Sequence, residues 1–282
     1  MDYFNINEFS GDKVALKANF NSADPFPAST HIDTLHAIIK KLNESDIAGL
    51  TLAERSGMGN TRHVLEEMGV FELSDKLGFE VTVLDEEDRD EWLKIEKDGT
   101  HWVKGFYIPK LFLESDKVVQ TCCLKTHRFG GHFTLSLKNS VGIVAKRLPN
   151  GLYNYMAELH VSPYQRVMIA EINKHYNVDM VIMDAINAFI TKGPEQGEVV
   201  KPNLILASAD RVAIDAVGVA ILRNYGVKTG ISKGPIFELD QIRRAAELEI
   251  GVKSAQEIEL VPLNDESHSD AESIMKILET QG

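Results

Sequence analysis

Short apolar runs alternate with longer amphipathic segments along the chain. The runs with the length and two-residue period of strands cover residues 13–17, 48–53, 79–84, 118–124, 178–183 and 203–207. Helical spacing or a capping signal marks segments that begin near residues 30, 60, 162, 212, 238 and 269. Strands that alternate with helices predict an α/β fold, in which a mostly parallel sheet is covered by helices on both faces.

Local signals refine this outline. Asn60 is a candidate N-cap, and Gly69 is a candidate C′ glycine of the short helix between them. Aromatic and β-branched residues within 100–113 predict a hairpin or an edge strand. Residues 143–160 contain a weak boundary, with an exposed excursion expected at 144–151. No linker is strong enough to divide residues 1–282, so we expect a single α/β domain.

Charge and hydropathy exclude several classes of partner. The 282-residue chain has a net charge of -12 and a pI near 5.2. Neither nucleic acid nor an anionic membrane surface is therefore expected as its main partner. The first residues lack the basic start and apolar core of a signal peptide, and no apolar run reaches transmembrane length.

The two cysteines are adjacent in a predicted buried strand, at Cys122 and Cys123. Neighbouring cysteines rarely pair without strain, so we expect both to be reduced, which favours a cytoplasmic protein. Two thiols are too few for an ordinary four-thiolate cluster within one chain. No iron–sulfur cluster is therefore expected.

One segment, residues 124–142, concentrates basic and histidine side chains in an otherwise acidic protein. It contains Lys125, His127, His132, Lys138 and Asn139. Such a local reversal of charge is typical of a functional site. The segment predicts a site for an anion or a metal ion.

Polar residues also follow several of the predicted strands. They are Lys17 and Asn19, then Glu54, Arg55, Ser56, Gly57 and Gly59, then Lys125, Thr126 and His127, then Asp184, and finally Ser208 and Asp210. Ligands of open parallel sheets bind beyond the carboxyl ends of the strands, so we expect these residues to share one composite site. Free amides near Gly57 and Gly59 could hold a phosphate or carboxylate, although an ordinary tight turn explains the same glycines.

The histidines and lysines allow more than one chemistry. His127, His132 and His160 are candidate ligands of a divalent metal, because neutral imidazoles bind transition metals. Their spacing matches no standard zinc pattern, however. Contact with an anion or general acid–base work is the alternative for His127, and a structural hydrogen bond would explain each histidine alone. Lys138 either binds an anion in a concave site or is a surface lysine.

Asp215 lies in a run that is apolar all round, residues 212–222, and should therefore be buried. A buried carboxylate needs a cation, several donors or a ligand. Arg211, one turn earlier, is a sufficient structural partner, and a role in the site is the alternative. The glycines and proline of residues 192–197 predict a turn over the same sheet edge, which could act as a lid.

Several of these residues occur in the order of known family signatures. The sequence resembles the domain-of-unknown-function-362 family at Leu124–His127, at Leu137–Asn139 with Gly142, at Asp184 with Gly193, Pro194 and Gly197, and at Ala209–Ala216. Lys17, Asn19 and Ser56–Gly59 fit its amino-terminal half.

The resemblance implies an α/β fold with a shared site, and it strengthens Lys125, His127, Lys138, Asn139, Asp184 and Asp215 as candidates. Many members carry ferredoxin-type cysteine clusters. This chain cannot supply such a cluster, because it has only two cysteines.

Two function classes remain open from the sequence. The first is a cytoplasmic enzyme acting on a small anionic ligand, with Lys125 and Lys138 holding the anion and His127 as general acid–base. The second is a non-catalytic protein that binds or handles a cofactor or metal in the same pocket. A substrate-sized cleft favours the enzyme, whereas a tightly held cofactor favours the second class.

Overall fold

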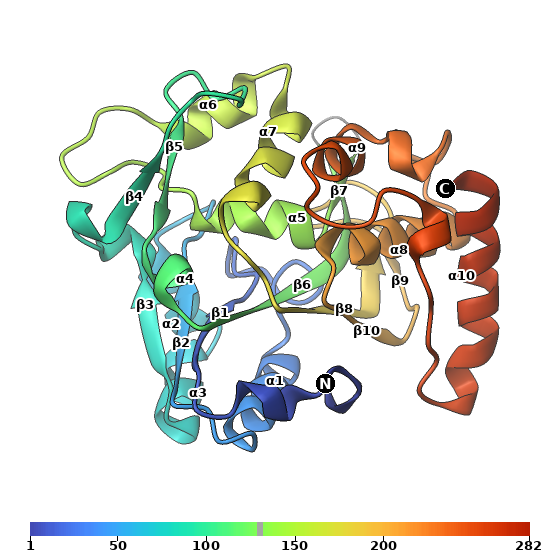
Figure 1. Ribbon diagram of the computed structural model, residues 1–282, viewed down its shortest axis with the longest axis horizontal. Coiled ribbons are helices and arrows are strands. Elements are labelled where there is room, and N and C mark those ends of the chain that lie inside the picture. The colour runs from blue at the N-terminus through green and yellow to red at the C-terminus, as the bar shows by residue number, and fades with distance from the viewer. Residues whose placement is uncertain (129–131) are drawn as a thin grey trace.

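The computed structural model describes residues 1–128 and 132–282, and a mixed eight-stranded sheet runs through its centre (Figure 1). Its main strands are β1 (Lys13–Lys17), β2 (Gly49–Glu54), β3 (Glu80–Val83), β6 (Lys117–His127), β8 (Met180–Phe189) and β10 (Leu204–Ser208). They lie in the order β10-β8-β6-β1-β2-β3, all parallel except β10. Two short strands, β7 (His132–Thr134) and β9 (Val199–Val200), pair antiparallel with β6 and β8.

One face of the sheet is covered by the amino-terminal helices, α1 (Ile32–Asn43), α2 (Thr61–Glu67) and α3 (Val70–Leu77). Alternate residues of the strands, such as Leu16 and Leu52, pack there against Leu35 of α1. Asn60 caps α2, since its side chain accepts a hydrogen bond from the amide of His63.

The other face carries the remaining helices. They are α5 (Ser136–Asn139), α6 (Tyr155–Val161), α7 (Gln165–Ile172), α8 (Arg211–Asn224), α9 (Asp240–Glu247) and α10 (His268–Gln281). The apolar helix α8 lies directly against β6 and β8, where Val217 belongs to the same buried cluster as Leu124 and Met183. The predicted mostly parallel α/β sheet with helices on both faces is therefore confirmed.

A separate antiparallel hairpin consists of β4 (Trp92–Ile95) and β5 (Phe106–Pro109), followed by α4 (Leu111–Glu114). The sequence predicted a hairpin or edge strand within 100–113, but the hairpin begins earlier, at Trp92. Within residues 1–128 and 132–282, the 3-10 helices are Asp2–Phe4, Ile6–Phe9, Leu84–Glu86, Arg89–Glu91, Ser140–Ile143, Asn173–His175, Ile236–Glu238, Ala255–Glu257 and Asp265–Ser267.

The expected exposed excursion at 144–151 is wrong for most of its length. Val144, Ala145 and Leu148 are buried in a cluster with Trp102 and Phe106 of the hairpin region. The charged pair Lys146–Arg147 between them made this segment look exposed. No helix in the described part of the chain is long and apolar enough to cross a membrane.

Candidate functional site

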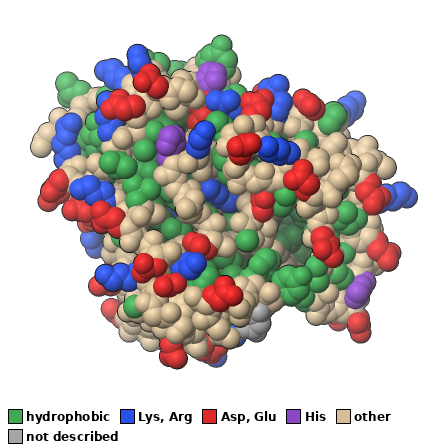
Figure 2. All heavy atoms as spheres, in the orientation of Figure 1, with side chains coloured by type: hydrophobic (Ala, Val, Ile, Leu, Met, Phe, Trp, Pro, Cys, Tyr) green, Lys and Arg blue, Asp and Glu red, His purple; other side chains and the backbone are tan. Residues whose placement is uncertain are grey.

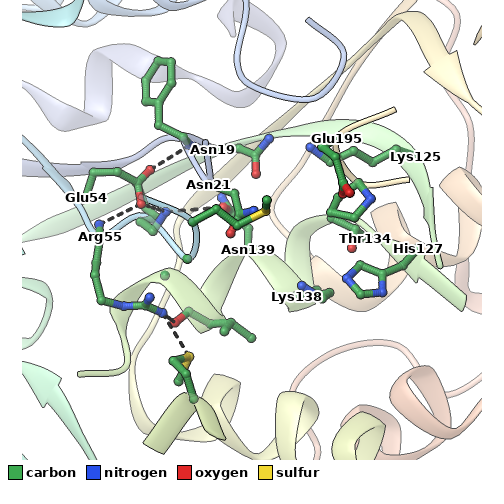
Figure 3. Close-up of a pocket in the computed structure, with 18 of the residues that line it drawn as sticks. Asn19, Asn21, Glu54, Arg55, Lys125, His127, Thr134, Lys138, Asn139 and Glu195 are labelled. Carbon is green, nitrogen blue, oxygen red and sulfur yellow. Dashed lines mark hydrogen bonds and ion pairs between the residues drawn. The ribbon is translucent and has the colours of Figure 1, made fainter. Parts of the chain in front are cut away.

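A cavity of about 290 Å³ opens at the carboxyl ends of β1, β2 and β6. This volume is near the lower limit for ligand pockets, which favours a small ligand. Its polar lining comprises Lys17, Asn19, Asn21, Glu54, Arg55, Lys125, His127, Arg128, Thr134, Lys138, Asn139, His160 and Glu195. Figure 3 shows Glu54, Arg55 and Asn139 toward one end, and Lys125, His127, Thr134, Lys138 and Glu195 toward the other.

Lys17 and Glu54 form a buried ion pair at the first end. They lie at the ends of the neighbouring strands β1 and β2, and the Lys17 Nζ to Glu54 Oε1 distance is 2.5 Å. Glu54 also accepts backbone amides from Arg55 at 2.9 Å and Phe20 at 3.2 Å. Burial raises the pKa of Glu54 and lowers the pKa of Lys17, while their mutual attraction opposes both shifts. The pair closes the floor of the cavity.

Lys125 reaches the cavity wall from β6 but is already anchored. Its ammonium donates to the carbonyl oxygens of Ala28 and, at 3.3 Å, of Pro27. It therefore holds the loop after β1 against β6. Asn19 holds the same loop, because its side chain donates to the Ala28 carbonyl at 3.1 Å.

Lys138 differs from these two lysines. It lines the cavity from α5 and is partly buried, yet its ammonium makes no hydrogen bond or ion pair with the residues that the structure describes. Burial, followed by the positive charges of Arg166, Lys125 and Arg55, lowers the pKa of Lys138 to about 7. A cation held among cations lacks a counter-charge, which an anionic ligand would supply.

Asp215 is fully buried, as predicted, but Arg211 is not its hydrogen-bond partner. Its carboxyl oxygens accept the backbone amides of Ser136 at 2.8 Å and Leu137 at 3.2 Å. These amides open α5, so Asp215 caps the helix that carries Lys138 and Asn139. Arg211 instead donates to Asn173 and to the Tyr176 carbonyl. Asp215 does not line the cavity, and it acts on the site through α5.

The three candidate metal-binding histidines lie in different surroundings. His127 and His160 line the cavity, whereas His132, the register partner of His127 on β7, is absent from the lining. Burial, assisted by Arg166, lowers the pKa of His132 to about 4.

Among the described residues, no three His, Cys, Asp or Glu side chains form a group that could hold a metal ion. The predicted set of three ligands is therefore not assembled. Binding of a divalent metal by fewer protein ligands stays a prediction.

His127 is tied to α7. The guanidinium Nη2 of Arg166 lies 3.4 Å from His127 Nδ1. Because arginine can only donate, Nδ1 accepts in this contact and the neutral ring carries its proton on Nε2. The Nε2–H group of His127 can therefore donate a hydrogen bond from a fixed ring orientation.

Only part of the glycine-containing turn after β2, residues 56–59, lines the cavity. Gly57 lines the cavity, and a Cβ there would clash with the Asn21 side-chain oxygen, so a larger residue would have to displace the Asn21 side chain. Ser56 faces away from the cavity and donates to the Phe20 carbonyl at 2.6 Å. Gly59 has φ +86 and serves the turn rather than the lining.

Asp184 does not join the cavity. It is buried on β8 and accepts a hydrogen bond from the Thr34 hydroxyl at 2.6 Å and from the Ile186 amide at 3.1 Å. The Thr34 contact ties α1 to β8, whereas the Ile186 contact lies within β8. The geometry thus brings Lys125, His127 and Lys138 together but leaves Asp184 outside.

The turn at residues 192–197 does lie over the sheet edge, where Pro194 and Glu195 line the cavity. The Arg128 amide donates to the Gly193 carbonyl at 2.7 Å, and the Arg128 side chain forms an ion pair with Glu195. A role as a lid stays a prediction.

The sequence placed Glu54 and Arg55 among the polar residues that follow the strands and Glu195 in the turn 192–197, but made none of them a candidate site residue, and it did not select Asn21. The first two had a usable signal, because they end the strand beside β1 and so must lie near Lys17.

The fold and cavity define an α/β protein with a cation-rich pocket at the carboxyl edge of its parallel strands. Residues 14–220 match the family model described as "Domain of unknown function (DUF362)". This match covers more than half of the chain, so the protein belongs to that family, and the predicted resemblance is confirmed.

No curated protein matches the chain significantly. Among solved structures, the lactate racemase apoprotein from Thermoanaerobacterium thermosaccharolyticum is similar, with 17% sequence identity and a TM-score of 0.46. The similarity covers 75% of this chain and 49% of that chain, so it extends over about half of the racemase. A likeness this distant carries no argument about the site.

Proposed function

We propose that this protein is an enzyme acting on a small anionic ligand, a carboxylate or a phosphate, in the cavity at the carboxyl edge of its sheet. One observation supports this most directly: the Lys138 ammonium lines the cavity and has no acceptor among the described residues. Lys17 and Lys125, by contrast, already have theirs. An anion bound beside Lys138 would relieve the repulsion from Arg166 and Arg55.

Within this proposal, Lys138 binds the anion and Lys125 adds positive charge to the wall. His127, oriented by Arg166, exchanges a proton with the bound ligand.

The buried, unpaired cysteines Cys122 and Cys123 support a reducing compartment, the cytoplasm, as the site of action.

A Lys138→Gln variant tests the anion site. Loss of one charge-assisted contact costs about 1.5–3 kcal/mol, which corresponds to roughly 10- to 100-fold weaker binding. Calorimetry with inorganic phosphate and with a series of small mono- and dicarboxylates measures this change. Native mass spectrometry of the purified protein identifies any ligand that is carried along.

Lys97→Gln is the matched control, since Lys97 is exposed and lies outside the cavity. It should leave the affinity for the same anions unchanged. Equal affinities of the wild type and the Lys138→Gln variant for every anion that binds would refute the assignment of Lys138.

The affinity for the anion should also depend on pH. The pKa of Lys138 is lowered to about 7, so the side chain is an ammonium below that pH and a neutral amine above it. Affinity is therefore expected to fall as the pH rises through about 7. The Lys138→Arg variant stays charged and should keep its affinity between pH 6 and 8. A parallel fall in both proteins would assign the titration to another group.

A further inference from the structure

A second hollow, of about 490 Å³, lies along the outer edge of β10. Its walls are β10, the N-terminal residues Tyr3 and Phe4, the segment 259–264, and the first two turns of α10. We call it the β10 groove. Figure 2 shows hydrophobic side chains gathered over this part of the molecule, with Asp and Glu side chains around them. The groove shares no lining residue with the cavity described above.

The walls of the β10 groove offer unpaired backbone. β10 is the last strand of the sheet and pairs only with β8 among the described strands. Across the groove, no amide or carbonyl of residues 259–263 makes a hydrogen bond to the described backbone. An extended segment with free donors and acceptors beside an open strand edge is the geometry that an added β-strand requires.

Several side chains of the groove are apolar and exposed. Ile205 of β10 is 53% exposed, Tyr3 is 58% exposed and Leu263 is 71% exposed. Side chains of an added strand would point alternately to the two faces of the sheet. Tyr3 and Leu263 come from different walls of the groove, so apolar residues of the added strand would find contacts on either wall.

The charges of the groove decide which occupant fits. Its lining contains Glu259, Glu266 and Asp270 but no lysine or arginine. A second copy of this chain would bring the same three carboxylates and a further net charge of -12 to the interface. Like charges facing each other oppose that pairing, whereas a basic partner is attracted.

We propose that the β10 groove is the docking site of an extended segment of a partner protein. The segment adds as a strand to the free edge of β10. It carries alternating apolar residues together with lysine or arginine. This interaction is independent of the anion site, so either proposal can fail without the other.

A random dodecapeptide display library, selected on the full chain, tests the proposal. Peptides that bind the wild type but not an Ile205→Glu variant are retained. The expected consensus has apolar residues at alternate positions and at least one Lys or Arg.

Synthetic copies of the selected peptides should bind at least tenfold more weakly to a triple variant, Glu259→Lys, Glu266→Lys and Asp270→Lys. Because the three carboxylates lie in the exposed lining, binding to the wild type should weaken with added salt.

Charge-swapped peptides provide the reciprocal control. Replacing their basic residues by glutamate should abolish binding to the wild type and restore it to the triple variant. Peptides methylated on alternate backbone amides test strand addition, because only the set that faces β10 should lose binding. Thermal melts of each variant confirm that it folds, and a Leu263→Asp variant replaces any that does not.

Three outcomes would overturn the proposal. The first is a selection that yields no peptide sensitive to Ile205→Glu. The second is equal binding of the selected peptides to the wild type and the triple variant. The third is a wild-type dimer that Ile205→Glu dissociates in sedimentation experiments, which would make a second copy the occupant.

Discussion

Replacement of Lys17 by methionine is expected to lower the free energy of unfolding by about 3–5 kcal/mol. Methionine keeps most of the apolar stem but removes the ammonium that neutralises Glu54. Both partners are 1% exposed, so solvent cannot take over that role. Loss of Lys17 is costly because it leaves the Glu54 carboxylate buried without a counter-charge. The intact ion pair itself adds little to the free energy of unfolding.

The deficit of the Lys17→Met variant should grow with pH. Burial already raises the pKa of Glu54 above its usual 4.5, and loss of Lys17 raises it further. Below about pH 4.5 the carboxyl is protonated in both the folded and the unfolded chain, and the deficit is smallest. As the pH rises, the unfolded chain releases its proton first, which favours unfolding. Urea denaturation of both proteins at pH 5 and pH 8 measures the change.

Two controls isolate the buried charge. Lys94 forms an exposed ion pair with Glu96, so Lys94→Met should leave the free energy of unfolding nearly unchanged. The double variant Lys17→Met with Glu54→Leu leaves no charge at the site and should recover much of the lost stability. If Lys17→Met is as stable as the wild type at pH 8, then Glu54 is not held as an uncompensated anion.

The sequence predicted the positions of the sheet strands well because their patterns are local. Val14–Leu16 and Met180–Met183 are short, continuously apolar runs within β1 and β8, so composition and length identify them. The same rule placed Lys17, Lys125 and His127 at strand ends, and all three line the cavity. A local pattern cannot say how far a strand continues, and β6 runs on through the basic residues to His127.

The sequence could not predict hydrogen-bond partners that only tertiary packing brings together. Asp184 follows an apolar run, as the other site candidates do. One of its carboxylate oxygens, however, accepts a hydrogen bond from the Thr34 hydroxyl, which lies on a helix 150 residues earlier. Burial of Asp215 followed from its apolar helix. Its partners could not be deduced, because they are backbone amides 78 and 79 residues away, and every residue except proline has such an amide. Local spacing pointed to Arg211 instead.

Asp215→Ala is the second substitution with a large expected effect, a loss of about 2–6 kcal/mol in the free energy of unfolding. It leaves the buried amides of Ser136 and Leu137 without their acceptor, and each orphaned group costs about 1–3 kcal/mol. Because α5 carries Lys138, affinity for the anion should also fall, by roughly tenfold. A stable variant with unchanged affinity would show that α5 needs no cap.

Asp215→Asn separates the hydrogen bonds from the charge. Its amide oxygen accepts one backbone N–H, while its NH₂ group faces the other donor, so about half of the loss in Asp215→Ala is expected.

Burial raises the pKa of Asp215 to about 8 from its usual 3.8. Between these values the folded wild type binds the proton more tightly than the unfolded chain does, so its stability declines as the pH rises toward 8. The asparagine variant lacks this decline. Its disadvantage, measured by urea denaturation, should therefore narrow from pH 5 to pH 8, and a gap that widens instead would mean that the carboxylate is the form that holds α5.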